Sequence, residues 1–204
     1  MLSQREAVER FTALGLDRES ARRVLVCGLV PPVRRGRGTT LYDERDVQAF
    51  LDRQRTDLPP WEEQFVVVLR TQPRRADADS PVGWSGIDLT APREEQLVAA
   101  RAGGRGMSGV TQAYVALRAE RDGAVPMLAT VGGFVALAAE ILGAVPRDDS
   151  ERRRPAWRLR AAGPWAEQWL GLFLPTGRGG SSWRILGSRT NVFVSRPRGV
   201  RTTL

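Results

Sequence analysis

The chain has 204 residues and a formal net charge of +8, and every one of its 31 basic residues is an arginine, so we expect two small domains and a polyanionic partner. It has no histidine and a single cysteine, which excludes histidine bases, Cys/His zinc sites and an intrachain disulfide, and suits a reducing cytoplasm. We expect neither catalysis nor a cofactor, and no membrane segment, because the charge-free run at 123–139 is short and interrupted by proline and glycine.

The first 30 residues predict two short helices joined by a tight turn. Ser3 and Glu6 have the spacing of a capping box, and Gly15 marks the end of that helix. Asp17 then caps a second helix, whose apolar face lies inward and which stops at Gly28. The lone Cys27, at the end of this helix, is expected to be a small buried apolar residue.

A hairpin and a third helix are predicted to follow. Pro31-Pro32 block helix continuation, and two glycines permit a tight hairpin between Val33 and Leu41. Asp43 has the position of the next N-cap, and the helix after it turns its apolar residues inward. We expect residues 1–55 to form one small domain.

The segment REAVERFTALGLDRESARRVLVCGLVPPVRRGRGTTLYDERDVQAFL resembles the winged helix-turn-helix DNA-binding domains of the MerR and excisionase-like families. The resemblance implies that the second helix enters a major groove and that the arginine-rich hairpin acts as a wing against phosphates or a minor groove. Arginine forks suit both guanine edges and phosphate oxygens. The DNA-contacting residues expected are Arg18, Ser20, Arg22 and Arg23 on the helix, and Arg34, Arg35, Arg37, Thr39, Thr40 and Tyr42 in the wing.

Residues 56–60, TDLPP, are expected to link this domain to a second one at 61–204. There the pattern predicts a strand at 65–69, an exposed loop at 71–83 and a helix over 93–102. Further strands are expected at 111–118, 127–137, 156–160, 182–187 and 191–194. The fold class expected for the whole chain is therefore α+β, with a second domain that could close into a barrel.

The C-terminal quarter carries most of the excess charge. Residues 151–204 have a net charge of +9, against +3 for residues 1–55 and −4 for 56–150. LATVGGFVALAAEIL, WRLRAAGPW and WLGLFLPTGRGGSSWRIL are weakly similar to PUA-like domains of the EVE type, which implies a pocket for a modified or flipped base. A second nucleic-acid surface would then use Arg158, Arg160, Arg178, Trp183 and Arg184. The other interpretation is a regulatory or structural α+β domain whose glycines make turns and whose tryptophans form an ordinary core.

Three functions remain open from the sequence. The first is a transcriptional regulator that recognises a specific DNA duplex, with a second domain for a small ligand or a partner. The second is a reader of modified or single-stranded nucleic acid in defence or repair. The third is an excisionase-like architectural protein that coats DNA cooperatively. With no long heptad repeat, a homodimer would have to use the second domain.

Overall fold

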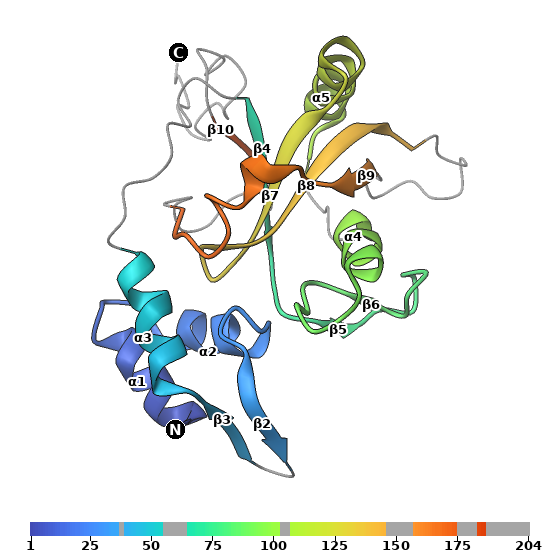
Figure 1. The fold of residues 1–204 in the computed structure, drawn as a ribbon. Helices are drawn as coiled ribbons and strands as arrows, with labels where there is room; N and C mark the ends of the chain where they lie inside the picture. Colours follow the sequence, from blue (N-terminus) through green and yellow to red (C-terminus); the bar gives the residue numbers. More distant parts are fainter. Residues whose placement is uncertain (37–38, 55–64, 103–106, 146–156, 175–182, 187–204) are drawn as a thin grey trace, which may run out of the picture.

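A computed structural model of the chain describes residues 1–36, 39–54, 65–102, 107–145, 157–174 and 183–186. The N-terminal unit, residues 1–54, contains three helices and a three-stranded sheet of order β1-β3-β2 (Figure 1). Its elements are β1 (Leu2–Ser3), α1 (Gln4–Thr12), α2 (Arg18–Val26), β2 (Pro32–Gly36), β3 (Thr39–Tyr42) and α3 (Glu44–Arg53). Strands β2 and β3 form an antiparallel hairpin that projects away from the rest of the molecule.

Side-chain caps fix where the three helices of the N-terminal unit begin. Ser3 and Glu6 form a complete capping box, in which each side chain hydrogen-bonds the backbone N–H of the other residue. Asp17 accepts from the Ser20 N–H at the start of α2, and Asp43 accepts from the Arg45 N–H at the start of α3. The predicted starts of all three helices are confirmed.

The sheet unit, residues 65–186, is a five-stranded sheet of order β10-β4-β7-β8-β9. Strands β4 and β7 are parallel, and the other neighbours are antiparallel. Its elements are β4 (Val66–Thr71), β5 (Arg75–Ala76), β6 (Trp84–Ser85), α4 (Arg93–Ala102), α5 (Gly109–Asp122), β7 (Val125–Val131), β8 (Phe134–Ala144), β9 (Trp157–Ala161), the 3-10 turn at Pro164–Ala166, and β10 (Trp183–Leu186). The chain is therefore α+β, and its sheet is open over the described residues, so the barrel expected from the PUA-like resemblance is not seen there.

One predicted strand is a helix. Residues 111–118, expected as a strand, lie inside α5. The Ser108 side chain caps this helix, Gly123 ends it with a left-handed φ of 80°, and Val115 and Ala119 bury one face at helical spacing. Caps and periodicity outweighed the strand propensity of single residues. The linker at 56–60 and the strand expected at 191–194 lie outside the described residues.

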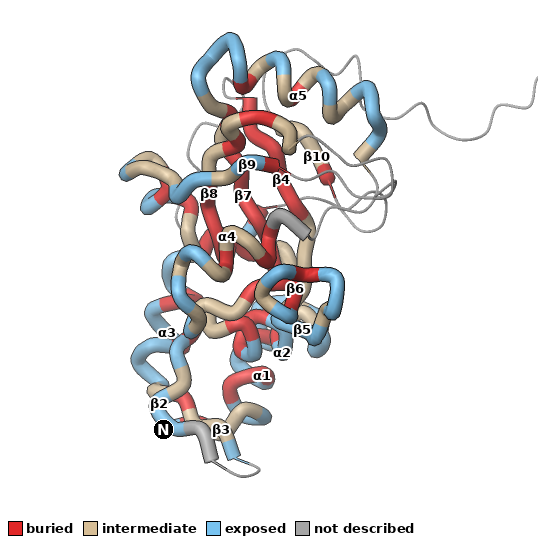
Figure 2. Tube along the Cα trace, turned by 90° about the vertical axis from the view of Figure 1, so that its right-hand side faces the viewer, coloured by how far each residue is buried: buried red, intermediate tan, exposed pale blue. Residues whose placement is uncertain are grey.

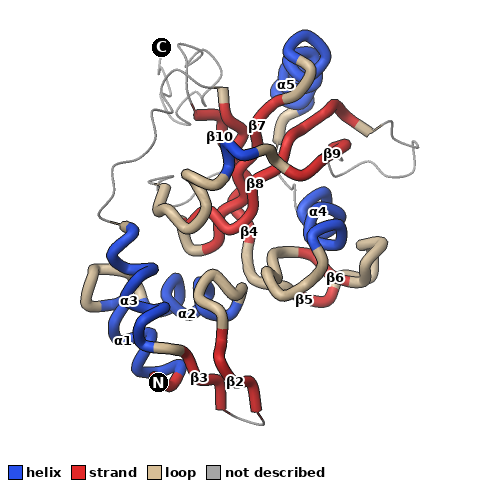
Figure 3. The backbone as a smooth tube through the Cα atoms, viewed as in Figure 1, coloured by secondary structure: helices blue, strands red, loops and turns tan. Residues whose placement is uncertain are grey.

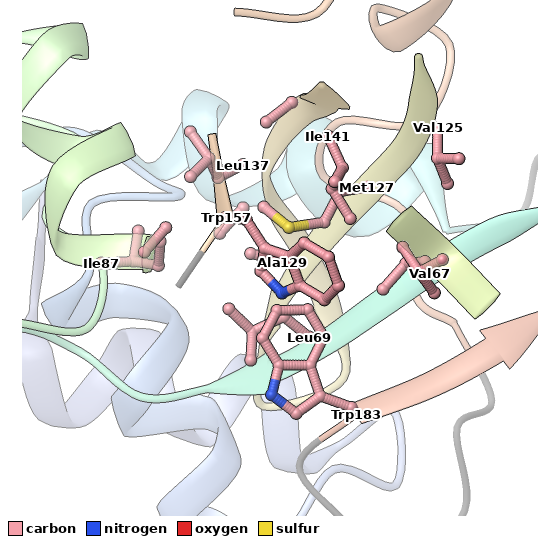
Figure 4. Packing of buried hydrophobic residues seen from close by; sticks show 14 of the residues in the cluster. Val67, Leu69, Ile87, Val125, Met127, Ala129, Leu137, Ile141, Trp157 and Trp183 are labelled. Atoms are coloured by element: carbon pink, nitrogen blue, oxygen red, sulfur yellow. The ribbon is translucent and has the colours of Figure 1, made fainter. Parts of the chain in front are cut away.

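Apolar layers cover both faces of the large sheet. On one face, residues of β4, β7, β8 and β9 pack with α4 and α5, and Figure 4 shows Trp157 and Trp183 among Val67, Leu69 and Met127. On the other face, the segment at 162–174 folds over the sheet and inserts Trp169 and Leu174 (Figure 3). Figure 2 shows that the buried residues are concentrated along β4, β7 and β8, at the centre of this sandwich.

The two units are joined by the turn between β7 and β8. Phe134, the first residue of β8, is 1% exposed and belongs to the apolar core of the N-terminal unit. Its ring centroid lies 5.3 Å from that of Phe50 in α3 and 5.2 Å from that of Phe173 in the sheet unit. At Gly132 an added Cβ would lie 3.0 Å from the Ser20 carbonyl oxygen in α2, so the turn reaches α2 as well.

Polar contacts reinforce this junction at two further places. The Gln54 side-chain amide donates to the Gly171 carbonyl at 2.8 Å and accepts from the Phe173 N–H at 2.9 Å. Near the other end of the seam, the Leu89 N–H donates to the Cys27 carbonyl at 2.9 Å. The sheet unit therefore contacts both α2 and α3, the helices that flank the hairpin in the chain.

Replacing Phe134 with alanine is expected to lower the free energy of unfolding by about 3–5 kcal/mol, because it removes a buried ring shared by both units. Urea unfolding measures this. The matched control is Phe173→Ala, whose ring is 44% exposed and whose loss should be clearly smaller. Equal losses for the two variants would contradict the assignment of Phe134 as the central contact.

Burial raises the pKa of the Cys27 thiol to about 12, because the desolvated thiolate is disfavoured. We expect a thiol reagent at pH 8 to modify the folded chain far more slowly than the chain unfolded in urea. An unfolded thiol has a pKa near 9.0, so the thiol's contribution to stability is complete below pH 9 and is lost as the pH rises toward 12. Fast modification of the folded chain would show that the junction opens readily.

Candidate nucleic-acid interface

One side of α2 is exposed and carries most of its charge. Ala21, Val24 and Leu25 are buried against α1 and the rest of the N-terminal core. The opposite side presents, at spacings of three and four residues, Arg18, Glu19, Arg22, Arg23 and Val26. We call these five residues the α2 face.

The arginines of the α2 face differ in how far their charge is compensated. Arg23 forms an ion pair with Glu19, one turn earlier, with 3.1 Å between Nε and the carboxylate. Within the part of the chain that the structure describes, Arg18 and Arg22 have no acidic partner. These two guanidinium groups therefore keep all their hydrogen-bond donors available for an anion or a base edge.

Beside the α2 face lies an open groove of about 680 Å³ between the first turns of α1 and α2. It is lined by Gln4, Arg5, Val8, Arg18, Glu19 and Arg22. Three arginines against one glutamate give the groove a positive balance, although Arg5 also pairs with Glu9 at 3.0 Å. The sequence analysis missed Gln4 and Arg5, because their position beside α2 depends on how the two helices pack.

The hairpin presents part of the predicted wing. Val33, Arg34 and Thr39 are exposed and Thr40 is half-buried. Strand pairing sets Arg35 opposite Thr40, while the side chain of Arg35 and the whole of Arg37 lie outside the described residues.

Two of the predicted DNA contacts are unsuited to that role. Tyr42 is 2% exposed and lies in the N-terminal core, so its ring contributes to packing and is not on the surface. The Ser20 hydroxyl donates to the Asp17 carboxylate at 2.8 Å as part of the helix cap, and its backbone lies against Gly132. Both residues are removed from the candidate interface.

The second basic surface, predicted in the C-terminal quarter, is not assembled by the described residues. Trp183 is 5% exposed, and its ring stands edge-on to buried Trp157 with 6.4 Å between centroids, so it has no free face for a base. Arg160 is paired with Glu140 at 2.6 Å, and Arg158 hydrogen-bonds the Leu142 carbonyl. Arg184 is half-buried with a partner of its own, and Arg178 lies outside the described residues.

Glu140 of β8 is the carboxylate that binds both Arg160 and the Trp165 indole. Its partial burial alone would raise the carboxyl pKa, but hydrogen bonds from the Trp165 indole at 3.0 Å and from Arg160 outweigh burial and leave the pKa below its usual range. Arg160 is therefore held by a carboxylate that stays ionised at neutral pH. Trp157, Trp169 and Trp183 are core residues, as the alternative interpretation of the sequence expected, and the Trp165 indole N–H donates to the Glu140 carboxylate.

Comparison of the chain with known protein families, with curated proteins and with solved structures finds no match. Within the described ranges, no group of three or more cysteine, aspartate and glutamate side chains could hold a metal ion. In the same ranges, no helix is both long and apolar enough to cross a bilayer.

Proposed function

We propose that the chain is a sequence-specific, double-stranded DNA-binding regulator of transcription. The observation that carries the proposal is the α2 face, where Arg18 and Arg22 are exposed without acidic partners among the described residues, next to a groove of positive balance. Folding gains little from such an arrangement, since neither arginine makes an ion pair there. A polyanion would supply the missing partners.

The order of elements in the N-terminal unit supports a winged helix-turn-helix. Two helices joined by a short turn are followed by a hairpin and a closing helix, and the exposed side of the second helix is the side opposite the core. In such domains the second helix lies in the major groove and the hairpin contacts the backbone beside it. The α2 face and Arg34 would then meet one duplex together.

Each part of this surface has its own task in the proposed mechanism. Arg18, in the groove between α1 and α2, binds a backbone phosphate and sets the register of the protein on the duplex. Arg22, one turn further along α2, reaches a guanine edge, where a fork of two donors matches the O6 and N7 acceptors. Arg34 in the hairpin contacts a flanking phosphate without reading sequence.

Replacing Arg22 with alanine is expected to relax the preference for one guanine position, with about 1–3 kcal/mol of discrimination lost there. Mobility-shift titrations against a duplex selected from a random library, and against single-base variants of it, measure the effect. The matched control is Arg121→Ala on α5, an exposed arginine distant from α2 (Figure 1). Unchanged affinity and selectivity of the Arg22 variant would refute the docking of α2.

Replacing Arg34 with alanine should have a different signature. It is expected to weaken binding to all duplexes by a similar factor and to reduce the slope of log affinity against log salt by about one, because one phosphate contact is lost. Titrations at several salt concentrations, compared with Arg121→Ala, measure this slope. A selective loss on one sequence would instead assign Arg34 to base readout.

A further inference from the structure

The α2 face contains one apolar side chain that the fold leaves partly exposed. Val26 is 46% exposed, whereas its neighbours Val24 and Leu25 are at most 1% exposed in the core. It follows Arg18 and Arg22 at four-residue intervals, so the three side chains form a single line along the outer side of the helix. A β-branched residue adds little helix propensity, and almost half of the Val26 surface stays in contact with water.

The surroundings of Val26 limit what could cover it. Arg22 and Arg23 lie four and three residues before it on the same side of α2, so a partner there must tolerate cations and still offer an apolar group. DNA meets both conditions in its major groove, where acceptor atoms and phosphates lie beside one apolar substituent, the C5-methyl group of thymine. Valine has no hydrogen-bond donor or acceptor, so its contact with a base edge is restricted to that methyl group.

We propose that Val26 is a specificity residue that selects a thymine by packing against its C5-methyl group; this rests on the proposed function of α2. Four residues along a helix advance about 6 Å, and neighbouring base pairs are about 3.4 Å apart. The thymine recognised by Val26 therefore lies about two base-pair steps from the guanine read by Arg22. The DNA target of the chain therefore contains a guanine, read by Arg22, and a thymine, read by Val26, at this fixed distance from each other.

The experiment removes only the methyl group. Full-length chain is used to select a duplex from a random library, and each thymine of that duplex is then replaced in turn by deoxyuridine, which pairs identically but lacks the methyl. Affinities are measured for the unaltered chain, for Val26→Ala, and for Val110→Ala as a matched control. Val110 is a 65% exposed valine on α5, far from α2 (Figure 1).

The unaltered chain and Val110→Ala are expected to lose about three- to tenfold in affinity at one deoxyuridine position, the value of one buried methyl group. Val26→Ala is expected to show a much smaller difference between the thymine and deoxyuridine duplexes at that position, because its shorter side chain buries less of the methyl group. The inference is overturned if no thymine is sensitive, or if Val26→Ala retains the full sensitivity.

The Arg22 variant separates this failure from failure of the proposed function. If Arg22→Ala relaxes the guanine preference while Val26→Ala changes nothing, α2 reads DNA and only the thymine contact is wrong. If the chain selects no duplex, or if Arg22→Ala behaves as the unaltered chain does, the docking of α2 is wrong and the Val26 contact is overturned with it.

Discussion

The insertion of Phe134 into the N-terminal core is the contact on which the arrangement of the molecule depends. A strand of the sheet unit starts with a residue that completes another unit's apolar cluster, so neither side of the junction is fully packed without the other. Gly132 makes this approach possible, since its backbone has a φ of 61° and its missing Cβ leaves room for the α2 backbone. As a consequence, α2 is held against the sheet unit.

Such a junction bears on how the proposed DNA interface is organised. A helix and a wing carried on a flexible tether would have to be ordered against each other when they bind, at a cost in conformational entropy. Here α2 is held by the β7–β8 turn, and Gln54 ties the end of α3 to the loop that carries Phe173. The sheet unit thus gives preorganisation, and a change in its packing near the turn would reach α2 directly.

The exposed arginines differ in whether they form an ion pair with a neighbouring carboxylate. In the sheet unit Arg160 meets Glu140, and on α5 Arg121 meets Asp122, so these cations are satisfied within the protein. On α2 only Arg23 has such a partner, in Glu19. Exposed pairs of this kind contribute little to stability, but they decide which guanidinium groups are left to bind something else. On the α2 face two neighbouring exposed arginines, Arg18 and Arg22, are left in this way beside a groove of positive balance.

The sequence by itself determined the local features of this protein. The starts of the first three helices follow from Ser3, Asp17 and Asp43, because a cap is satisfied within three residues of its own position. The α+β class and the hairpin follow from periodicity and glycine placement in the same way. Only tertiary structure decided which aromatic rings are buried. Tyr42 and Trp183 stand near arginines and polar residues in the sequence, as residues of a binding surface would, yet both lie in cores. Burial depends on contacts between residues distant in sequence, as at Phe134, and no local pattern carries that information.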